Sequence, residues 1–145
     1  MITYDQRWSR RAVRVAGPLI QTPMEGDRKK ALAWNIEILV NNAGVLEGGS
    51  VLDIPGPNMR HEFEVNVIGP LLLTQGIAKQ MVKRRKGRIV WVSSREGLNV
   101  NPLTGIYSAS KHAIEAIAET MSLELQELAH PASPWVSIGS LKVAA

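Results

Sequence analysis

A short apolar segment that ends in two serines limits the possible folds of this chain more than any other feature. Residues 87–94 read Gly-Arg-Ile-Val-Trp-Val-Ser-Ser, and a long helical pattern follows at 107–128. An apolar run rich in β-branched residues predicts a buried strand. In parallel α/β sheets, ligands bind outside the carboxyl ends of the strands, so Ser93 and Ser94 are expected at a ligand-binding edge.

The helical pattern that follows opens with the letters Tyr-Ser-Ala-Ser-Lys. Its first and fifth residues, Tyr107 and Lys111, are four positions apart and therefore share one face of the predicted helix. A strand-end serine, Ser94, a tyrosine and a lysine can then converge on one point. A hydroxyl, a phenol and an ammonium group at one point predict chemistry on alcohols and carbonyl compounds.

The rest of the chain alternates strand patterns with helix patterns. Strands are predicted at 36–40, 88–94 and 135–139, and helices at 27–34, 58–85 and 107–128. This order predicts parallel strands joined by crossover helices. The expected fold class is therefore α/β, with a partial, doubly wound parallel sheet of about three strands and flanking helices.

Pro70 lies inside the predicted helix 58–85. Proline has no N–H group, so the carbonyl of Asn66, four residues earlier, loses its helical partner and is open to water or another donor. Two interpretations fit the spacing equally well. One is a deliberate polar defect next to the tyrosine and lysine, and the other is a simple kink.

Charge divides the chain into two unequal parts. Its 145 residues suffice for one ordinary domain, and the formal net charge is +4. Residues 1–30 hold seven Lys/Arg and three acids, whereas basic and acidic residues balance in the remainder. We expect residues 1–26 to form a basic, poorly ordered arm and residues 27–145 to form the domain. A mitochondrial presequence is the alternative for the arm, because such segments are arginine-rich and poor in acids.

Composition excludes several kinds of site and partner. The chain has no cysteine, which excludes disulfides, thiolate metal ligands and a cysteine nucleophile, and fits a reducing compartment such as the cytoplasm. No apolar run approaches the ~20 residues of a membrane span, so no membrane partner is expected. Because the excess positive charge lies in the arm, no nucleic-acid partner is expected. No residue pattern predicts a metal site.

Four motifs, taken in order, resemble those of the short-chain dehydrogenase/reductase family, whose members are NAD(P)-dependent oxidoreductases with a Rossmann fold. They are Asn41-Asn42-Ala43-Gly44 after a strand, Asn66 within Val-Asn-Val, Ser94 after the strand 88–94, and Tyr107-x-x-x-Lys111. Ser94 precedes Tyr107 by 13 positions, the spacing of the family pattern. One such motif is a weak signal, but four at matching spacing are a strong one. The resemblance covers roughly residues 27–139 and implies a Rossmann-like sheet.

The resemblance implies a role for each of these residues. Tyr107 is the implied general acid/base, and Ser94 hydrogen-bonds the substrate oxygen. A free tyrosine, with a pKa of ~10, is a poor base at neutral pH, and a neighbouring ammonium group such as that of Lys111 favours the phenolate. Lys111 also binds the nicotinamide ribose, together with Tyr107, and Asn66 holds a water of a proton relay. The implied contacts to the adenosine side of NAD or NADP come from three consecutive residues, Asn42, Ala43 and Gly44.

The chain also departs from the family pattern. It has no T-G-x-x-x-G-x-G turn, the element whose backbone N–H groups bind the cofactor pyrophosphate. Roughly the first three strands and the last strand of the family sheet are missing. We therefore expect a truncated form that contains only the central catalytic part and binds NAD or NADP weakly or not at all.

The implied substrate and partner follow from the same comparison. Leu98, Val100 and Leu103, in the loop after the serines, are consistent with a small apolar alcohol or ketone. Helices 58–85 and 107–128 resemble the pair that builds the dimer interface of the family, so a homodimer is expected.

Three classes of function remain open on the sequence alone. The first is an oxidoreductase, either active or inactive in this form. The second is a catalytically dead interaction module derived from that family. The third is a serine/lysine hydrolase, since Ser108-x-x-Lys111 fits S-x-x-K, but the S-D-N and K-T-G motifs that accompany it are absent.

Overall fold

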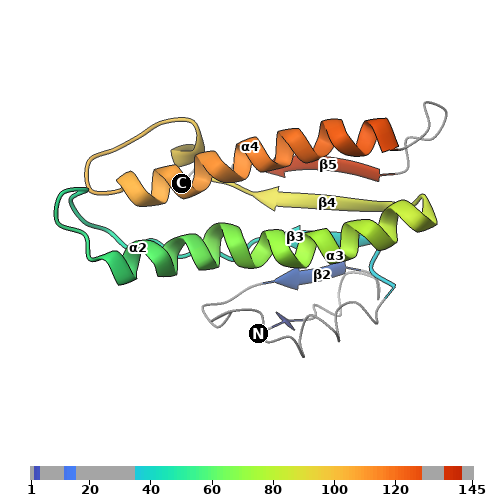
Figure 1. Ribbon diagram of the computed structural model, residues 1–145, viewed down its shortest axis with the longest axis horizontal. Helices are drawn as coiled ribbons and strands as arrows, with labels where there is room; N and C mark the ends of the chain where they lie inside the picture. Colours follow the sequence, from blue (N-terminus) through green and yellow to red (C-terminus); the bar gives the residue numbers. More distant parts are fainter. Residues whose placement is uncertain (1, 4–11, 16–34, 129–135, 142–145) are drawn as a thin grey trace.

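The fold is a mixed sheet covered by helices. The computed structural model describes residues 2–3, 12–15, 35–128 and 136–141, and side-chain surroundings within 35–125. The sheet has five strands in chain order, β1 to β5. They are β1 (Ile2–Thr3), β2 (Ala12–Val15), β3 (Ile38–Asn41), β4 (Gly87–Val92) and β5 (Val136–Leu141) (Figure 1). Strands β2 to β5 are parallel, and β1 is antiparallel to β2.

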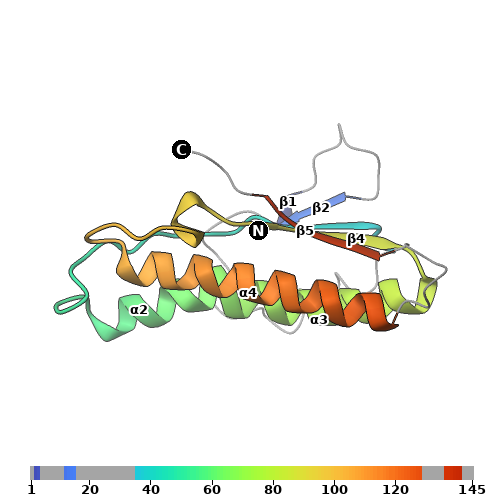
Figure 2. The same cartoon turned by 90° about the horizontal axis from the view of Figure 1, so that it is seen from above.

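The α-helices form one layer on the sheet, and two short helical segments, η1 and η2, accompany them (Figure 2). They are α2 (Gly56–Phe63), the π-helical segment η1 (Glu64–Ile68), α3 (Gly69–Arg84), the 3₁₀ turn η2 (Arg95–Gly97) and α4 (Gly105–Leu128). Helices α2, α3 and α4 lie on the same face of the sheet (Figure 2). Of the two helical layers of a doubly wound sheet, the described residues thus show one. Within this described part, no helix combines the length and apolarity needed to cross a membrane.

Apolar side chains from the strands and from the helices pack together in the core. Leu39 and Ile89 are register partners on β3 and β4, and neither is exposed. Trp91, two residues after Ile89, points to the same side and is 1% exposed. These side chains pack against apolar positions of α3 and α4, among them Ile77 and Ile114. Burial of this kind contributes ~25 cal/mol per Å² of apolar surface, which fixes α3 and α4 to the sheet.

The α/β class and the parallel sheet agree with the sequence prediction, but the strand count of about three is wrong. Two short strands, β1 and β2, join the sheet from within residues 1–26. The segment Ala-Val-Arg-Val at 12–15 has β-branched residues, and its backbone groups pair with the otherwise open edge of β3. The division into an arm of residues 1–26 and a domain from residue 27 stays a prediction. The predicted helix 27–34 lies outside the described residues.

The long helix predicted at 58–85 is interrupted at the predicted place. It consists of α2 and α3 joined by the π-helical segment η1, in which the Gly69 N–H donates to the Glu64 carbonyl five residues back. Pro70 then falls in the first turn of α3. The wider π turn accommodates a proline that would clash in a continuous α-helix. That the Asn66 carbonyl is open to water stays a prediction.

The turn between α3 and β4 is tight. Arg85 ends α3 in the left-handed region, at φ 52°, and the Lys86 N–H donates to the Met81 carbonyl at 3.1 Å. The chain then passes so close to α3 that a Cβ at Gly87 would lie 2.4 Å from Cγ and 2.8 Å from Cβ of the fully buried Met81. Glycine at 87 is therefore a packing requirement.

Gly87→Ala is expected to lower the free energy of unfolding by about 1–3 kcal/mol, because Met81 or the start of β4 must move to admit the methyl group. Denaturant unfolding of the purified chain measures this loss. Gly48→Ala is the matched control, because its Cβ would meet Leu46 Cδ2 at 3.5 Å and the Leu103 carbonyl at 3.8 Å, ordinary contacts. A Gly87→Ala variant as stable as the Gly48→Ala variant would contradict the packing argument.

Candidate active site

The four motif segments meet at the carboxyl ends of β3 and β4. Strand β3 ends at Asn41, and β4 ends at Val92, directly before Ser93 and Ser94. Helix α4 begins at Gly105, so Tyr107 lies in its first turn and Lys111 one turn later. Parallel strands present their carboxyl ends on one edge, which is where ligands bind in such sheets.

Lys111 ties α4 to the end of β4. Its side chain is only 3% exposed, and its Nζ donates a hydrogen bond to the Val92 carbonyl at 3.2 Å. The same Nζ lies 5.5 Å from the centroid of the half-buried Tyr107 ring. The predicted pairing of tyrosine and lysine on one helix face is therefore present, next to the residues that end β4.

Burial acts on the charge of Lys111. Removal of the ammonium group from water lowers the pKa of Lys111, because desolvation disfavours the charged form. The carboxylate of Glu62 opposes this effect and favours the ammonium. The site thus holds a lysine that is easier to deprotonate than a lysine in water.

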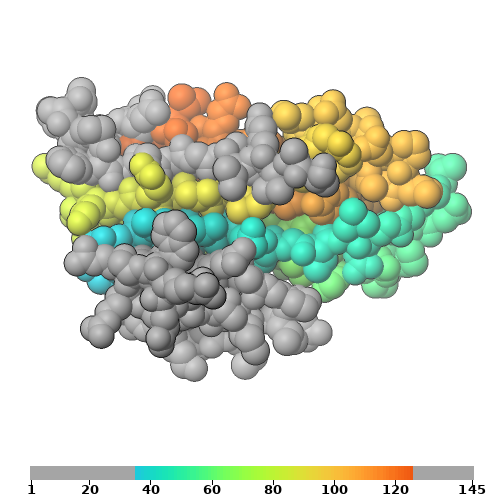
Figure 3. All heavy atoms as spheres, turned by 180° about the vertical axis from the view of Figure 1, so that it is seen from behind, coloured from blue at the N-terminus to red at the C-terminus, as the bar shows by residue number. Residues whose placement is uncertain are grey.

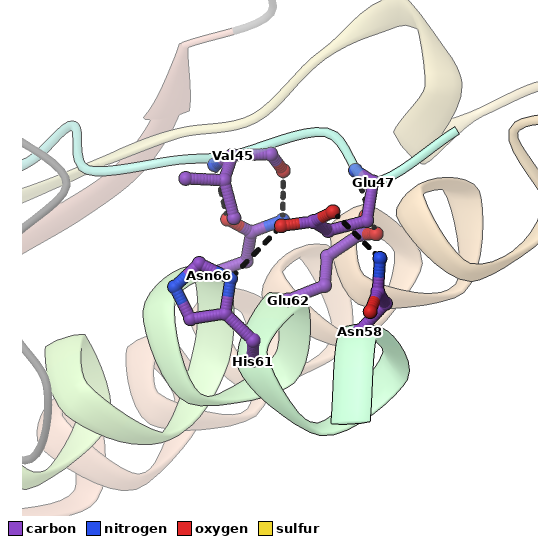
Figure 4. A network of polar contacts seen from close by, with 6 residues as sticks. All are labelled: Val45, Glu47, Asn58, His61, Glu62 and Asn66. Carbon is purple, nitrogen blue, oxygen red and sulfur yellow. Dashed lines mark hydrogen bonds and ion pairs between the residues drawn. The ribbon is translucent and has the colours of Figure 1, made fainter. Parts of the chain in front are cut away.

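The buried amide of Asn66 makes three hydrogen bonds in the site. Asn66 lies in η1, is 1% exposed, and its Oδ1 accepts the N–H of Val45 at 2.8 Å (Figure 4). Its Nδ2 donates to the Val45 carbonyl and to Ser110 Oγ, both at 2.9 Å. Asn66 therefore joins the π-helical segment, the loop after β3 and helix α4 through its amide group.

Ser110 completes this connection, and the sequence prediction did not include it. Its side chain is fully buried, and its Oγ donates to the Tyr107 carbonyl at 2.7 Å while it accepts from Asn66. The position of Ser110 next to Lys111 carries no sequence signal of its own. Only its burial on the inward face of α4 identifies it.

The loop after β3 approaches the site through Gly44. A Cβ at Gly44 would lie 3.4 Å from Lys111 Nζ and 3.6 Å from Asn66 Oδ1. Of the other two residues predicted to contact a cofactor, Asn42 is half-buried, and Ala43 is 5% exposed and packs in the core. The structure therefore places Gly44 beside Lys111 and Asn66. The side chain of Ala43 is part of the core, so Ala43 could contact a ligand only through its backbone.

Ser94 lies at the end of β4 and caps the turn that follows. Its Oγ accepts the N–H of Glu96 at 3.2 Å, and η2 begins at the next residue. The neighbouring Ser93 hydroxyl is buried without a hydrogen-bond partner among the described residues. That the hydroxyls of Ser94 and Tyr107 reach the same substrate oxygen stays a prediction.

Glu96 fixes the loop 95–104 to the start of α4. Its carboxylate accepts from Asn101 Nδ2 at 2.5 Å, from Ser108 Oγ at 2.9 Å and from Thr104 Oγ1 at 3.3 Å. These hydrogen bonds, with that from Asn101 the strongest, lower the pKa of Glu96. Ser108 is 1% exposed, and its hydroxyl donates a hydrogen bond to Glu96. The serine/lysine hydrolase alternative therefore lacks an accessible nucleophile.

Within the described residues, no three His, Cys, Asp or Glu side chains are grouped so that they could hold a metal ion. The groups available at the site are a phenol, an ammonium group, hydroxyls and an amide. This set suits proton transfer and hydrogen bonding to an oxygen atom.

Comparison with known proteins agrees with this arrangement. The family model described as short chain dehydrogenase matches residues 20–129. The NADPH-dependent 3-dehydrocapnine reductase of Ornithobacterium rhinotracheale is 34% identical over 114 residues, which cover 74% of this chain and 40% of that protein. The first curated relatives are all matched over less than half of their length.

Solved structures show the same fold. A 4-hydroxyisoleucine dehydrogenase complexed with NADH and succinate superposes with a TM-score of 0.73 at 25% identity, over 83% of this chain and 55% of that one. The acetoin dehydrogenase YohF from Salmonella typhimurium superposes with a TM-score of 0.68 at 32% identity, over 76% and 42%. The motifs, the geometry of the site and these matches lead to one conclusion: the chain belongs to the short-chain dehydrogenase family.

Proposed function

We propose that residues 35–128 form the catalytic part of an NAD(P)-dependent oxidoreductase that interconverts alcohols and carbonyl compounds, with Tyr107 as the acid/base. The observation that carries this proposal is the buried ammonium group of Lys111, held at the end of β4 at 5.5 Å from the Tyr107 ring. This lysine places a positive charge beside the ring of the proposed acid/base. A tyrosine that exchanges its proton near neutral pH is what such a reaction requires.

Each side chain has a separate task in this proposal. In the direction of reduction, the Tyr107 hydroxyl gives its proton to the carbonyl oxygen, and in oxidation the phenolate takes the proton of the alcohol. Ser94 donates a hydrogen bond to that same oxygen. Asn66 connects the loop at Val45 to helix α4 through hydrogen bonds, and Ser110 extends this connection to the Tyr107 carbonyl. These bonds keep Tyr107 and Lys111 in position.

The described residues fit one end of a nicotinamide cofactor. NAD(P) would supply or accept the hydride. Lys111 donates one hydrogen bond, to the Val92 carbonyl, and has two further N–H groups. Gly44 carries no side chain that would keep a ribose away from Lys111. The sequence has no Gly-rich turn for the pyrophosphate. The relatives use either cofactor form, since one is named as NADPH-dependent and another is complexed with NADH.

An apolar surface beside the site supports a small apolar alcohol or ketone as the substrate. The loops 44–55 and 95–104 meet at one end of the molecule, where the Gly49 N–H donates to the Leu103 carbonyl at 2.9 Å (Figure 3). Both loops expose large apolar side chains, namely Leu46, Val51, Leu52, Leu98, Val100 and Leu103. Apolar side chains gathered beside a catalytic group are typical of substrate-binding surfaces.

Titration of nicotinamide fluorescence tests the cofactor proposal. The 145-residue chain is expected to bind NADH or NADPH with a millimolar dissociation constant, because the chain offers candidate groups for the ribose and nicotinamide but its sequence has no Gly-rich turn for the phosphates. Lys111→Met, of similar length but uncharged, is expected to abolish this binding. Lys79→Met, at an exposed lysine of α3, is the matched control and is expected to leave it unchanged.

Three results would contradict parts of this proposal. Micromolar binding would contradict the predicted weakness, and equal binding by the Lys111→Met variant would contradict the site. No binding at any soluble concentration would instead favour the catalytically dead interaction module.

We further propose that α3 and α4 pair with the same helices of a second copy. A shallow groove lies between these helices and is lined by Leu71, Gln75, Ala116, Ile117, Thr120, Met121 and Glu124. Ile68 and Leu123 add exposed apolar surface near it, at 39% and 60% exposure. A self-complementary, largely apolar surface on two long helices is suited to a two-fold symmetric interface.

Sedimentation velocity of two charge-reversed variants tests this pairing. Glu124→Arg places a long cation in the groove and is expected to weaken self-association at least tenfold. Glu119→Arg makes the same change on the same helix at an exposed position that does not line the groove, and is expected to have little effect. Equal association constants for the two variants, or a monomeric parent chain at micromolar concentration, would contradict the interface.

A further inference from the structure

Glu62 is a fully buried acid that no step proposed so far uses. It lies in α2 and is 0% exposed. Its Oε2 accepts the N–H of Glu47 at 3.1 Å, and its Oε1 has no hydrogen-bond partner among the described residues. A buried carboxyl group costs several kcal/mol unless nearby charge or hydrogen bonds compensate it. Its presence on the inner side of the helix therefore needs a physical reason.

The position of Glu62 links it to the catalytic residues. It precedes Asn66 by four residues, so both side chains leave the helix on the same side and reach the segment 45–47 (Figure 4). Asn66 binds the N–H and the carbonyl of Val45, and Glu62 binds the N–H of Glu47. This segment directly follows Gly44, which lies against Lys111 Nζ. Glu62 thus helps to hold the loop that forms one wall of the lysine site.

The charge of Glu62 also acts on Lys111. Burial raises the pKa of Glu62, as does the neighbouring carboxylate of Glu47, whereas the Glu47 N–H, His61 and the Lys111 ammonium lower it. In return, the Glu62 carboxylate is the charged group that raises the pKa of Lys111 against the effect of burial. The two groups act through space, since Lys111 Nζ donates to the Val92 carbonyl and Glu62 Oε2 accepts from Glu47.

We propose that Glu62 is a positioning residue for Lys111, whose carboxylate keeps the buried lysine protonated while it anchors the loop after Gly44. A neutral lysine would place no positive charge beside the Tyr107 ring, so the charge of Glu62 supports the proposed acid/base pair. This role rests on the proposed function only in that Lys111 is taken as the catalytic lysine. A structural role alone would require an acceptor for the Glu47 N–H but no charge.

The variant Glu62→Gln tests the negative charge of Glu62 separately from its role as a hydrogen-bond acceptor. Glutamine keeps an oxygen for the Glu47 N–H and removes the negative charge. Lysine-selective ¹³Cε NMR of the 145-residue chain follows the titration of Lys111, with Lys111→Met identifying its signal. Because a carboxylate stabilises an ammonium group, its removal is expected to shift the titration midpoint of Lys111 downward. Glu47→Gln, a matched change at an acid that does not act on Lys111, is expected to leave that midpoint unchanged.

An unchanged Lys111 midpoint in a folded Glu62→Gln variant would overturn the proposal. If this variant does not fold, the reciprocal measurement decides. The ¹³Cδ signal of Glu62 is then titrated in the parent and in Lys111→Met, where loss of the ammonium is expected to shift the Glu62 midpoint upward, and no shift would overturn the proposal. Neither titration contains a cofactor, so a failure to bind NADH bears only on the proposed function.

Discussion

The amide group of Asn66 is the contact on which the site depends. It bonds both polar backbone groups of Val45 and the hydroxyl of Ser110, and Ser110 in turn bonds the Tyr107 carbonyl. Few side chains can donate and accept in these directions at once, because only an amide carries a carbonyl oxygen beside two N–H donors. An aspartate at this position would lack both donors. The loop after β3 and the first turns of α4 would then lose their common support.

A π-helical segment makes this arrangement possible. The extra residue in the turn at 64–68 rotates the positions that follow it, while Glu62 and Asn66 both face the segment 45–47. Such turns lower the quality of the helical hydrogen bonds and persist where another part of the structure compensates for them. Here the compensation comes from the buried bonds of Asn66 and from Glu62. The π-helical segment and the proposed functional residues therefore occupy the same stretch of helix.

Part of the fold and of the candidate site could be predicted from the sequence. The strand predicted at 88–94, the helix carrying Tyr107 and Lys111, and the irregularity near Asn66 follow from periodicity, the spacing of the motifs and the chemistry of Pro70. Strand β2 was not accessible, because its pairing with β3 is set by an open edge and not by a local pattern. Ser110 and Glu62 were missed for a related reason. A serine or glutamate on a helix is usually solvated, and only tertiary packing shows that these two are buried.

The order of the strands bears on how such a chain is assembled. Strands β2 to β5 are neighbours in space in the order in which they are synthesised, with register partners such as Leu39, Ile89 and Ile138 separated by roughly 50 residues. Among the described strands, none has to be inserted between two that are already paired. Each strand–helix unit can therefore pair with the open edge of the unit before it, so the sheet can grow in chain order from β2 to β5.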